Sequence, residues 1–243
     1  MKQLLALVLA LSPLPLLANE GGGLQSAHTN VANPASLQRG ARLFMNYCSG
    51  CHSLEYMRYS RVAQDLGLSE DQAMRSLNFT GAKFGESIKA AMPAADATQW
   101  FGKAPPDLSL VARSRGVDWV YTYLKSFYID ESKSSGWNNP LLPGVSMPNV
   151  LWELQGVQRA TMAKGEHGAE PHVAKLSVAE NERGSLTEAE FDEAARDLTT
   201  FLQYAGEPAV LQRTSVGVWV ILFLALLTFL SYLVKVDYWK DVH

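Results

Sequence analysis

The sequence predicts a mainly α-helical domain with long loops, followed by one C-terminal transmembrane helix. Apolar residues recur at helical spacing in several stretches of the 243-residue chain. Segments rich in Gly, Pro, Ser and Asn separate these stretches, and no convincing strand pattern extends beyond a few residues. The run from Thr214 to Val234 near the C-terminus carries no charge, which is typical of a membrane-spanning helix.

The N-terminus has the pattern of a secretory signal peptide. Lys2 precedes an apolar run over residues 4–17, and the small residue Ala18 follows it. We therefore expect residues 1–18 to be a signal peptide that is cleaved after Ala18, and an uncleaved anchor is the alternative. The exported body of residues 19–210 is long enough for one domain with a sizeable core.

The first helix of this body is expected to lead directly into a cofactor-binding motif. Ser36 is the expected N-cap, and apolar side chains follow at helical spacing as far as Tyr47. Gly40 lowers the helix propensity of this stretch, which suggests that another backbone packs closely against it. The motif itself is Cys48-Ser49-Gly50-Cys51-His52, which contains the only two cysteines of the chain.

This motif has the spacing for covalent attachment of a c-type haem, in which two thiols add to vinyl groups and the histidine reaches the iron. A CxxC pair also marks thioredoxin-like redox enzymes. A structural disulfide across two residues would remove little chain entropy, and a zinc site would need a second ligand pair. A helix that runs into a haem motif is the arrangement of class I cytochromes c, so we expect a class I cytochrome c-like haem domain.

Two capping boxes predict further helix starts, at Ser69 with Gln72 and at Thr187 with Glu190. The second of these helices is expected to end near Gly206, a few residues before the membrane segment. The other expected elements are helical faces on either side of Gly116, loops over residues 94–110 and 132–148, and a polar, acidic surface excursion over residues 165–184.

The uncharged C-terminal run is long enough to cross a bilayer, because about 20 residues at ~1.5 Å per residue span the roughly 30 Å hydrocarbon core. Arg213 and Lys235 bracket it, and little chain remains beyond it that could bury a core helix. We expect a transmembrane anchor at residues 211–235 and a cytoplasmic tail at residues 236–243. The haem domain would then lie on the periplasmic side of a bacterial inner membrane.

A haem held by His52 has a second axial position, for which methionine is a soft ligand that raises the reduction potential. Met92 and Met147 both precede a proline in an expected loop, and the stiffer glycine- and proline-defined setting favours Met147. The less favoured methionines are Met45, Met57, Met74 and Met162. The remaining histidines, in expected loops and the tail, are His28, His167, His172 and His243.

The charge of the chain gives no indication of nucleic-acid binding. The formal net charge is −3, and no basic patch stands out along the sequence. Acidic residues gather between Glu166 and Glu207. This segment predicts either a solvated face or a docking surface for a basic partner.

Motifs along nearly the whole mature chain match one family. Gln38-Arg39-Gly40 precedes the haem motif, and Ser53 follows it. The match continues through MRYSR at residues 57–61, PPDLS at residues 105–109, the Met147-Pro148 loop and DLTTFLQYAGEP at residues 197–208. With the late membrane anchor added, the chain resembles the cytochrome c1 family, the haem-carrying subunit of the quinol–cytochrome c oxidoreductase (bc1) complex.

The resemblance implies specific roles for residues of this chain. One haem c would be bound covalently through Cys48 and Cys51, with His52 and Met147 as the axial ligands of its iron. Arg115 would pair with a haem propionate, and Arg113 is the competitor for that role. Trp119 falls on an aromatic position of the family.

The same resemblance implies a one-electron carrier with no bond chemistry on this chain. A Rieske iron–sulfur protein would deliver the electrons, a periplasmic cytochrome c would accept them, and cytochrome b and membrane lipid would surround the anchor of a dimeric complex. The residues alone leave three other functions open. They are a membrane-anchored c-type cytochrome that feeds an oxidase outside a bc1 complex, an exported thiol–disulfide oxidoreductase, and a haem enzyme with an open iron site.

Overall fold

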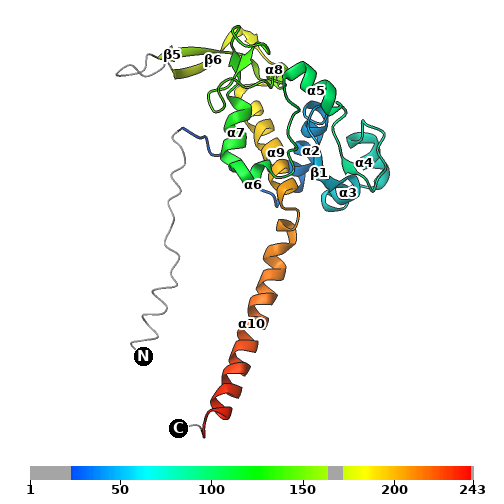
Figure 1. Cartoon of the computed structure of the whole chain (residues 1–243), viewed down its shortest axis with the longest axis vertical. Coiled ribbons are helices and arrows are strands. Elements are labelled where there is room, and N and C mark those ends of the chain that lie inside the picture. The colour runs from blue at the N-terminus through cyan, green and yellow to red at the C-terminus, as the bar shows by residue number, and fades with distance from the viewer. Residues whose placement is uncertain (1–22, 164–171, 242–243) are drawn as a thin grey trace.

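The computed structural model describes residues 23–163 and 172–241, so the predicted signal peptide, residues 1–18, lies outside the described residues. Helices predominate, which confirms the mainly α-helical prediction, and one long helix projects from the domain (Figure 1). The helices are α2 (Pro34–Tyr47), α3 (Tyr59–Leu66), α4 (Glu70–Leu77), α5 (Ala94–Phe101), α6 (Val111–Arg115), α7 (Val117–Lys125), α8 (Trp152–Gln155), α9 (Glu188–Gly206) and α10 (Val210–Tyr238). The strands pair two by two: β1 (Leu54–Arg58) with β2 (Ser87–Ile88), β3 (Tyr128–Ile129) with β4 (Trp137–Asn138), and β5 (Gly156–Ala163) with β6 (His172–Arg183).

Helices α2 and α9 form the centre of the core and approach each other closely. A Cβ added at Gly40 on α2 would lie 2.1 Å from the backbone oxygen of Asp197 on α9. Phe44 and Phe201 pack beside this contact, with their ring centroids 5.8 Å apart. The close approach predicted at Gly40 is therefore confirmed. It brings α9 against the helix that leads into the CxxCH motif.

The start of α2 differs from the prediction. Asn33, rather than Ser36, is the N-cap, and its side-chain oxygen accepts hydrogen bonds from two backbone N–H groups of the first turn. Pro34 follows at the first helical position, where a missing N–H has little cost. Ser36 is buried instead, and its hydroxyl donates to the carboxylate of Asp197, which also accepts from Arg39. The side chain of Ser36, which the local sequence pattern predicts as the N-cap, therefore binds Asp197 on α9 instead.

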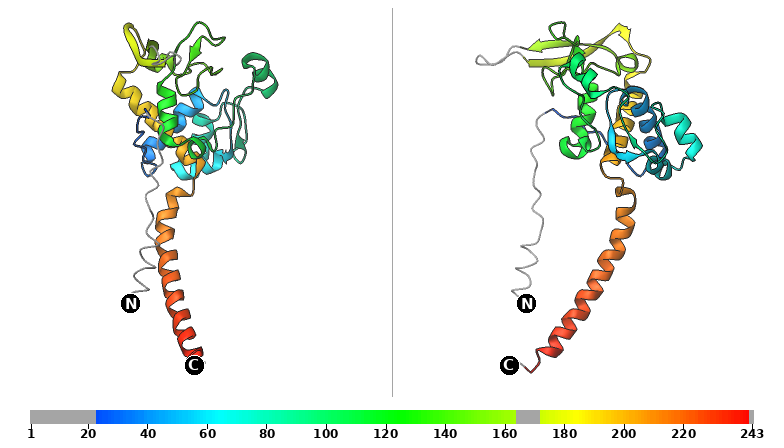
Figure 2. Two further views of the ribbon diagram at one scale, coloured as in Figure 1. Left: turned by 60° about the vertical axis from the view of Figure 1, so that its left-hand side comes forward. Right: turned by 45° about the vertical axis from the view of Figure 1, so that its right-hand side comes forward.

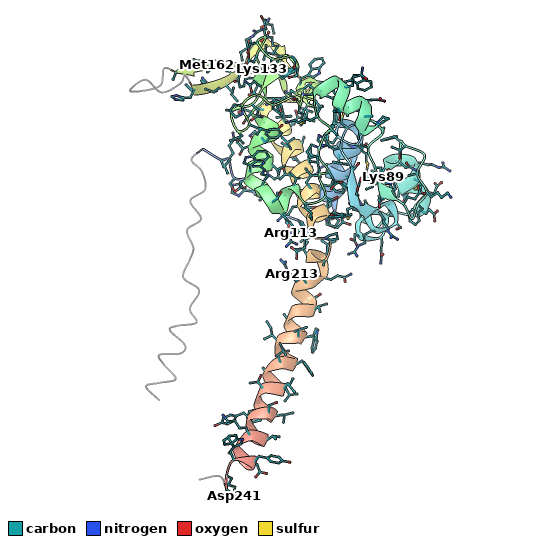
Figure 3. The ribbon with its side chains drawn as sticks, in the orientation of Figure 1. Lys89, Arg113, Lys133, Met162, Arg213 and Asp241 are labelled. Atoms are coloured by element: carbon teal, nitrogen blue, oxygen red, sulfur yellow. The ribbon has the colours of Figure 1, made fainter. Side chains whose placement is uncertain are left out.

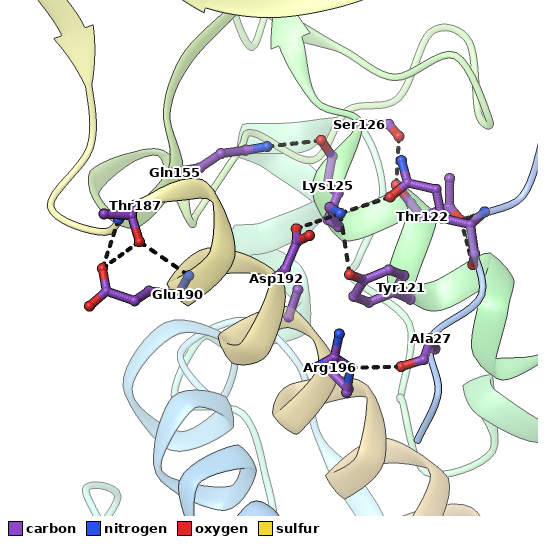
Figure 4. Close-up of polar contacts among 12 residues, drawn as sticks. Ala27, Tyr121, Thr122, Lys125, Ser126, Gln155, Thr187, Glu190, Asp192 and Arg196 are labelled. Atoms are coloured by element: carbon purple, nitrogen blue, oxygen red, sulfur yellow. Dashed lines mark hydrogen bonds and ion pairs between the residues drawn. The ribbon is translucent and has the colours of Figure 1, made fainter. Parts of the chain in front are cut away.

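Both predicted capping boxes are present. Ser69 and Gln72 cap α4, and Thr187 and Glu190 cap α9, each pair exchanging side-chain-to-backbone hydrogen bonds. Figure 4 shows the pair at the start of α9. Helix α9 ends at Gly206, as the sequence predicts.

Polar contacts fix helix α7 to α9 and to the N-terminal segment (Figure 4). The Nζ atom of Lys125 lies 2.5 Å from Oδ1 of Asp192 and 4.7 Å from the ring centroid of Tyr121. Arg196 on α9 donates from Nε to the carbonyl oxygen of Ala27 at 3.1 Å. Asp192 belongs to the acidic segment, so part of that segment serves an internal ion pair rather than a solvated face.

Two segments that were predicted to be irregular are regular. Helix α5 lies within the expected loop of residues 94–110, and it buries only Ala97, so its apolar periodicity is weak. Strands β5 and β6 form a long antiparallel ribbon, although the sequence predicted no long strand, and β6 lies within the predicted surface excursion of residues 165–184. Only Gly156 and Gln158 of β5 are buried, and no residue of β6 is, so neither strand needs a period-two alternation of apolar residues. The ribbon lies at the end of the domain remote from α10 (Figures 1 and 2).

Helix α10 follows α9 after a short junction and extends away from the domain (Figure 2). Its segment Ser215–Tyr238 is long and apolar enough to span a membrane, with a mean hydropathy of 2.4, and none of it is buried against the domain. The predicted anchor, residues 211–235, falls within this helix. The exact limits of the anchor and of the tail remain predictions.

Candidate functional site

One cavity brings the predicted site residues together. It lies between the turn that follows α2, helices α6 and α7, and the loop of residues 139–149, here called the ligand loop. The rest of its wall is mainly apolar and includes Leu108, Val120, Leu124, Leu198 and Leu202. The predicted site residues that line it are Cys48, Cys51, His52, Arg115 and Met147.

The backbone of the CxxCH motif forms a compact turn at the end of α2. The N–H groups of Cys51 and His52 both donate to the carbonyl oxygen of Cys48, at 3.0 and 2.8 Å. The segment that contains Met92 supports the turn, since the N–H of Met92 donates to the carbonyl oxygen of Gly50 at 3.0 Å. The turn therefore presents both thiols and the imidazole to the same cavity.

The orientation of His52 suits an axial ligand. Its side chain is 8% exposed, and Nδ1 lies 2.7 Å from the carbonyl oxygen of Pro106. Because a carbonyl only accepts, Nδ1 carries the proton in this bond and Nε2 keeps a free lone pair. Burial lowers the pKa of His52, which favours the neutral imidazole that metal binding requires.

The environment of the two cysteines does not suit a thiol–disulfide enzyme. Burial raises the pKa of the Cys48 thiol to about 12, and it also raises the pKa of Cys51. Redox-active cysteines work through a thiolate whose pKa is lowered. The raised pKa values of both thiols therefore oppose the oxidoreductase alternative.

Buried amide side chains attach the ligand loop to the C-terminal end of α7. Asn139, which is fully buried, donates from Nδ2 to the carbonyl oxygen of Tyr123 at 2.8 Å. At the other end of the loop, Asn149 donates to Oε1 of Gln155 at 3.2 Å, and Gln155 donates from Nε2 to the carbonyl oxygen of Lys125 at 2.9 Å. The last carbonyls of a helix have no partner within the helix, so they are available to hold the loop.

Met147 lies between Asn139 and Asn149 in the chain, and its side chain contacts Tyr123 on α7. The hydroxyl of Tyr123 donates to Sδ of Met147, with the oxygen and sulfur 3.6 Å apart. Burial raises the pKa of Tyr123 to about 12, so this hydroxyl keeps its proton at neutral pH.

The other methionines and histidines of the described residues lie away from the cavity wall. Met45 and Met57 are buried in the core, Met74 lies beside Asn78 on α4, and Met162 is exposed on β5. Met92 donates its backbone N–H to the carbonyl oxygen of Gly50 in the CxxCH turn and does not line the cavity. His28 and His172 are exposed, and His167 and His243 fall outside the described residues. Among the methionines predicted as ligand candidates, Met147 is thus the one that lines the cavity.

The two candidate arginines point to different places. Arg115 lines the cavity, and its Cζ lies 5.2 Å from the ring centroid of Trp119 in a cation–π contact. Arg113 instead lies 3.8 Å from the carboxylate of Glu207, which also pairs with Arg213. Figure 3 shows Arg113 and Arg213 at the junction between the domain and α10.

The donor set around the cavity fits a c-type haem. Two thiols and an imidazole come from one turn, a thioether sulfur comes from the ligand loop, and the intervening wall is mainly apolar. Within residues 23–163 and 172–241 no group of three His, Cys, Asp or Glu side chains is placed to hold a separate metal ion.

Sequence reasoning missed three side chains or backbone groups that orient the ligands. They are the carbonyl oxygen of Pro106, the hydroxyl of Tyr123 and the amide of Asn139. The PPDLS run and the helical face around Tyr123 were visible in the sequence, but neither pattern indicates which distant atom it will contact.

Comparisons with known proteins point to one family. The family model described as the Cytochrome C1 family matches residues 26–242. The chain is 52% identical over 244 residues to "Cytochrome c1" of Allochromatium vinosum, covering 100% of this chain and 99% of that protein. It is 40% identical over 246 residues to the "Ammonia monooxygenase gamma subunit" of Nitrosomonas europaea, covering 100% of both chains. It is 26% identical over 234 residues to "Cytochrome c1, heme protein, mitochondrial" of Saccharomyces cerevisiae, covering 86% of this chain and 67% of that protein.

Proposed function

Because the chain belongs to the cytochrome c1 family, we propose that it carries electrons from a Rieske iron–sulfur protein to a periplasmic cytochrome c. Members of the family are subunits of the bc1 complex, an oxidoreductase complex, and are anchored to the membrane by a single C-terminal helix. Family membership therefore favours a bc1 subunit over a separate membrane-anchored cytochrome that feeds an oxidase.

Four side chains hold the haem in this proposal. Cys48 and Cys51 would form the covalent thioether links, and Nε2 of His52 and Sδ of Met147 would be the protein ligands of the iron. The observation that carries the assignment is that all four line one cavity while His52 is fixed through Nδ1 by the carbonyl of Pro106. A hydrogen bond at the second ring nitrogen fixes the tautomer and orientation of a ligating histidine.

The chemistry that haem c supplies is reversible one-electron exchange at its iron. The chain provides the conditions for it. Its apolar wall excludes water from the site, and the thioether of Met147 is a soft donor that favours the ferrous state and a high potential. Arg115 carries its charge at the cavity wall, where a guanidinium would pair with a propionate carboxylate.

The membrane topology that we propose for the chain rests on its predicted signal peptide and on its apolar C-terminal helix. We propose that residues 1–18 are removed after export, that residues 19–210 lie in the periplasm and that residues 236–243 lie in the cytoplasm. Helix α10, which is apolar and not buried by the domain, would cross the membrane beside cytochrome b in a dimeric complex.

The test is haem staining of the purified, detergent-solubilised complex on a denaturing gel, with a reduced-minus-oxidised spectrum of the same sample. We expect a c-type signal that stays with this chain and copurifies with b-type haem. A variant with Cys48→Ala and Cys51→Ala should lose the stain. Covalent haem without b-type partners would contradict membership of a bc1 complex, and a chain without covalent haem would contradict the whole proposal.

A further inference from the structure

The contact between Tyr123 and Met147 has a consequence for electron transfer. We propose that Tyr123 is a positioning residue whose hydroxyl, by donating a hydrogen bond to Sδ of Met147, raises the reduction potential of the site. The contact joins Oη and Sδ over 3.6 Å, within the range for a sulfur acceptor. This inference rests on the proposed role of Met147 as an axial ligand.

The ring of Tyr123 is held in one place by its neighbours. It stacks on Trp119, with centroids 4.9 Å apart and an interplanar angle of 10°, and it meets the edge of Phe127 with centroids 4.9 Å apart. Its backbone carbonyl accepts the hydrogen bond from Asn139 that anchors the ligand loop. The same residue therefore holds the loop through its backbone and contacts the ligand through its side chain.

The hydroxyl has no competing partner nearby. Among the residues that the structure describes, Sδ of Met147 is the one group to which Oη of Tyr123 is hydrogen-bonded. The surrounding wall is mainly apolar, and a polar group left without a partner in such a place is costly. The free energy of burying the hydroxyl therefore favours keeping the sulfur beside it.

A thioether sulfur has two lone pairs, so it can bind iron with one and accept a hydrogen bond with the other. Donation to the second pair withdraws electron density from the sulfur and makes it a weaker donor. Ferric iron depends more on donor strength than ferrous iron does, so the hydrogen bond favours the ferrous state. Its loss should shift the ferrous-to-ferric equilibrium about fivefold, which is the size of a typical neutral hydrogen bond. For a one-electron couple, a fivefold shift corresponds to about 40 mV.

The test compares Tyr123→Phe with the control Tyr121→Phe in the purified complex. Tyr121 lies on the same helix and is buried, but its hydroxyl contacts Nζ of Lys125 at 3.2 Å rather than Met147. Spectroscopic redox titration should show a reduction potential that is lower by about 40 mV in Tyr123→Phe, which corresponds to the fivefold shift. The potential of Tyr121→Phe should be unchanged. The phenylalanine ring preserves the stacking on Trp119, so packing is the same in the variant.

A double-mutant cycle separates the hydrogen bond from a general packing effect. In a Met147→Leu background the sulfur is gone, and Tyr123→Phe should then leave the potential unchanged. An equal shift in both backgrounds would overturn the proposal.

The charge-transfer band of methionine-ligated ferric haem distinguishes failure of this inference from failure of the proposed function. If Tyr123→Phe keeps both the band and the wild-type potential, the role of Tyr123 is overturned while the ligand assignment stands. If the wild-type protein lacks the band, Met147 is not the ligand and both proposals fall. If the band weakens in Tyr123→Phe but not in Tyr121→Phe, the positioning role of Tyr123 is supported, because its hydroxyl then helps to keep the sulfur on the iron.

Discussion

At the scale of single residues, the imidazole of His52 depends on an atom far away in the chain. The acceptor of its Nδ1–H is the carbonyl oxygen of Pro106, 54 residues further on. Proline fixes its own φ and has no N–H, so a Pro-Pro pair is a stiff support for that carbonyl. The spacing of Cys48, Cys51 and His52 predicts their roles as haem-binding residues, and the structure places all three at one cavity. The partner of His52 was not predictable, because any backbone carbonyl has the same chemistry and only the fold brings this one close.

Replacement of Met147 tests the proposed axial ligand. Met147→Leu should keep the covalently bound haem but lower its reduction potential sharply, by well over tenfold in the ferrous-to-ferric equilibrium, because a soft sulfur donor is lost. Redox titration checks this, with Met92→Leu as a control whose side chain does not line the cavity. An unchanged potential in Met147→Leu would remove Met147 from the iron.

Replacement of the two arginines tests which of them serves the haem. Arg115→Gln should lower the potential, since a positive charge beside the site favours the added electron. The side chain is exposed, so we expect a shift of no more than about fivefold. Arg113→Gln should have no effect on the potential, because Arg113 faces Glu207 instead. The reverse order of the two effects would assign the propionate to Arg113.

At the scale of elements, the pairing of α2 with α9 depends on one residue without a side chain. Gly40→Ala should destabilise the protein by about 1–3 kcal/mol, because the new methyl group meets a backbone oxygen that cannot move aside. The control is Gly85→Ala, where an added Cβ meets nothing within 4 Å, so we expect a change within about 0.5 kcal/mol. Thermal unfolding followed by circular dichroism measures both. Equal midpoints for the two variants would contradict the close packing.

The attachment of the ligand loop to α7 gives a second prediction at this scale. Asn139→Ala removes the buried hydrogen bond to the carbonyl oxygen of Tyr123, which then keeps only the N–H of Ser126 as a partner, at a cost of about 0.5–1.5 kcal/mol. Covalent haem should remain, while the ferric charge-transfer band of the methionine ligand weakens. Asn78→Ala is the matched control, because Asn78 makes a similar bond to the carbonyl of Ala82 away from the cavity. A full-strength band in Asn139→Ala would show that the loop is held by other contacts.

The elements that the sequence predicted best are those that local contacts determine. The capping boxes at α4 and α9 join residues three positions apart, so their spacing is visible in the sequence. The β5–β6 ribbon was missed because its strands are stabilised by pairing with each other rather than by burying one face in the core. Helix α5 was missed for a related reason, since only Ala97 is buried. The spacing of apolar residues in a sequence indicates which residues are buried, and few residues of these elements are buried.

At the scale of the whole molecule, the domain and the membrane helix are structurally separate. The core of α2, α9 and their neighbours is complete without Ser215–Tyr238, of which nothing is buried against the domain. A chain that ends after Arg213 should therefore leave the membrane fraction while it keeps covalent haem and the methionine charge-transfer band. Fractionation followed by haem staining and spectroscopy measures this. Loss of haem from the shortened chain would mean that the anchor supports the domain.

The junction between α9 and α10 spans only Glu207, Pro208 and Ala209. The N–H of Val210 donates back to the carbonyl of Glu207, and the side chain of Glu207 pairs with Arg213 on the new helix. These contacts across a three-residue junction oppose a hinge motion between α9 and α10. If the chain carries electrons as proposed, its cavity would keep a nearly constant distance from the membrane, and the donor and acceptor proteins would have to move to reach it.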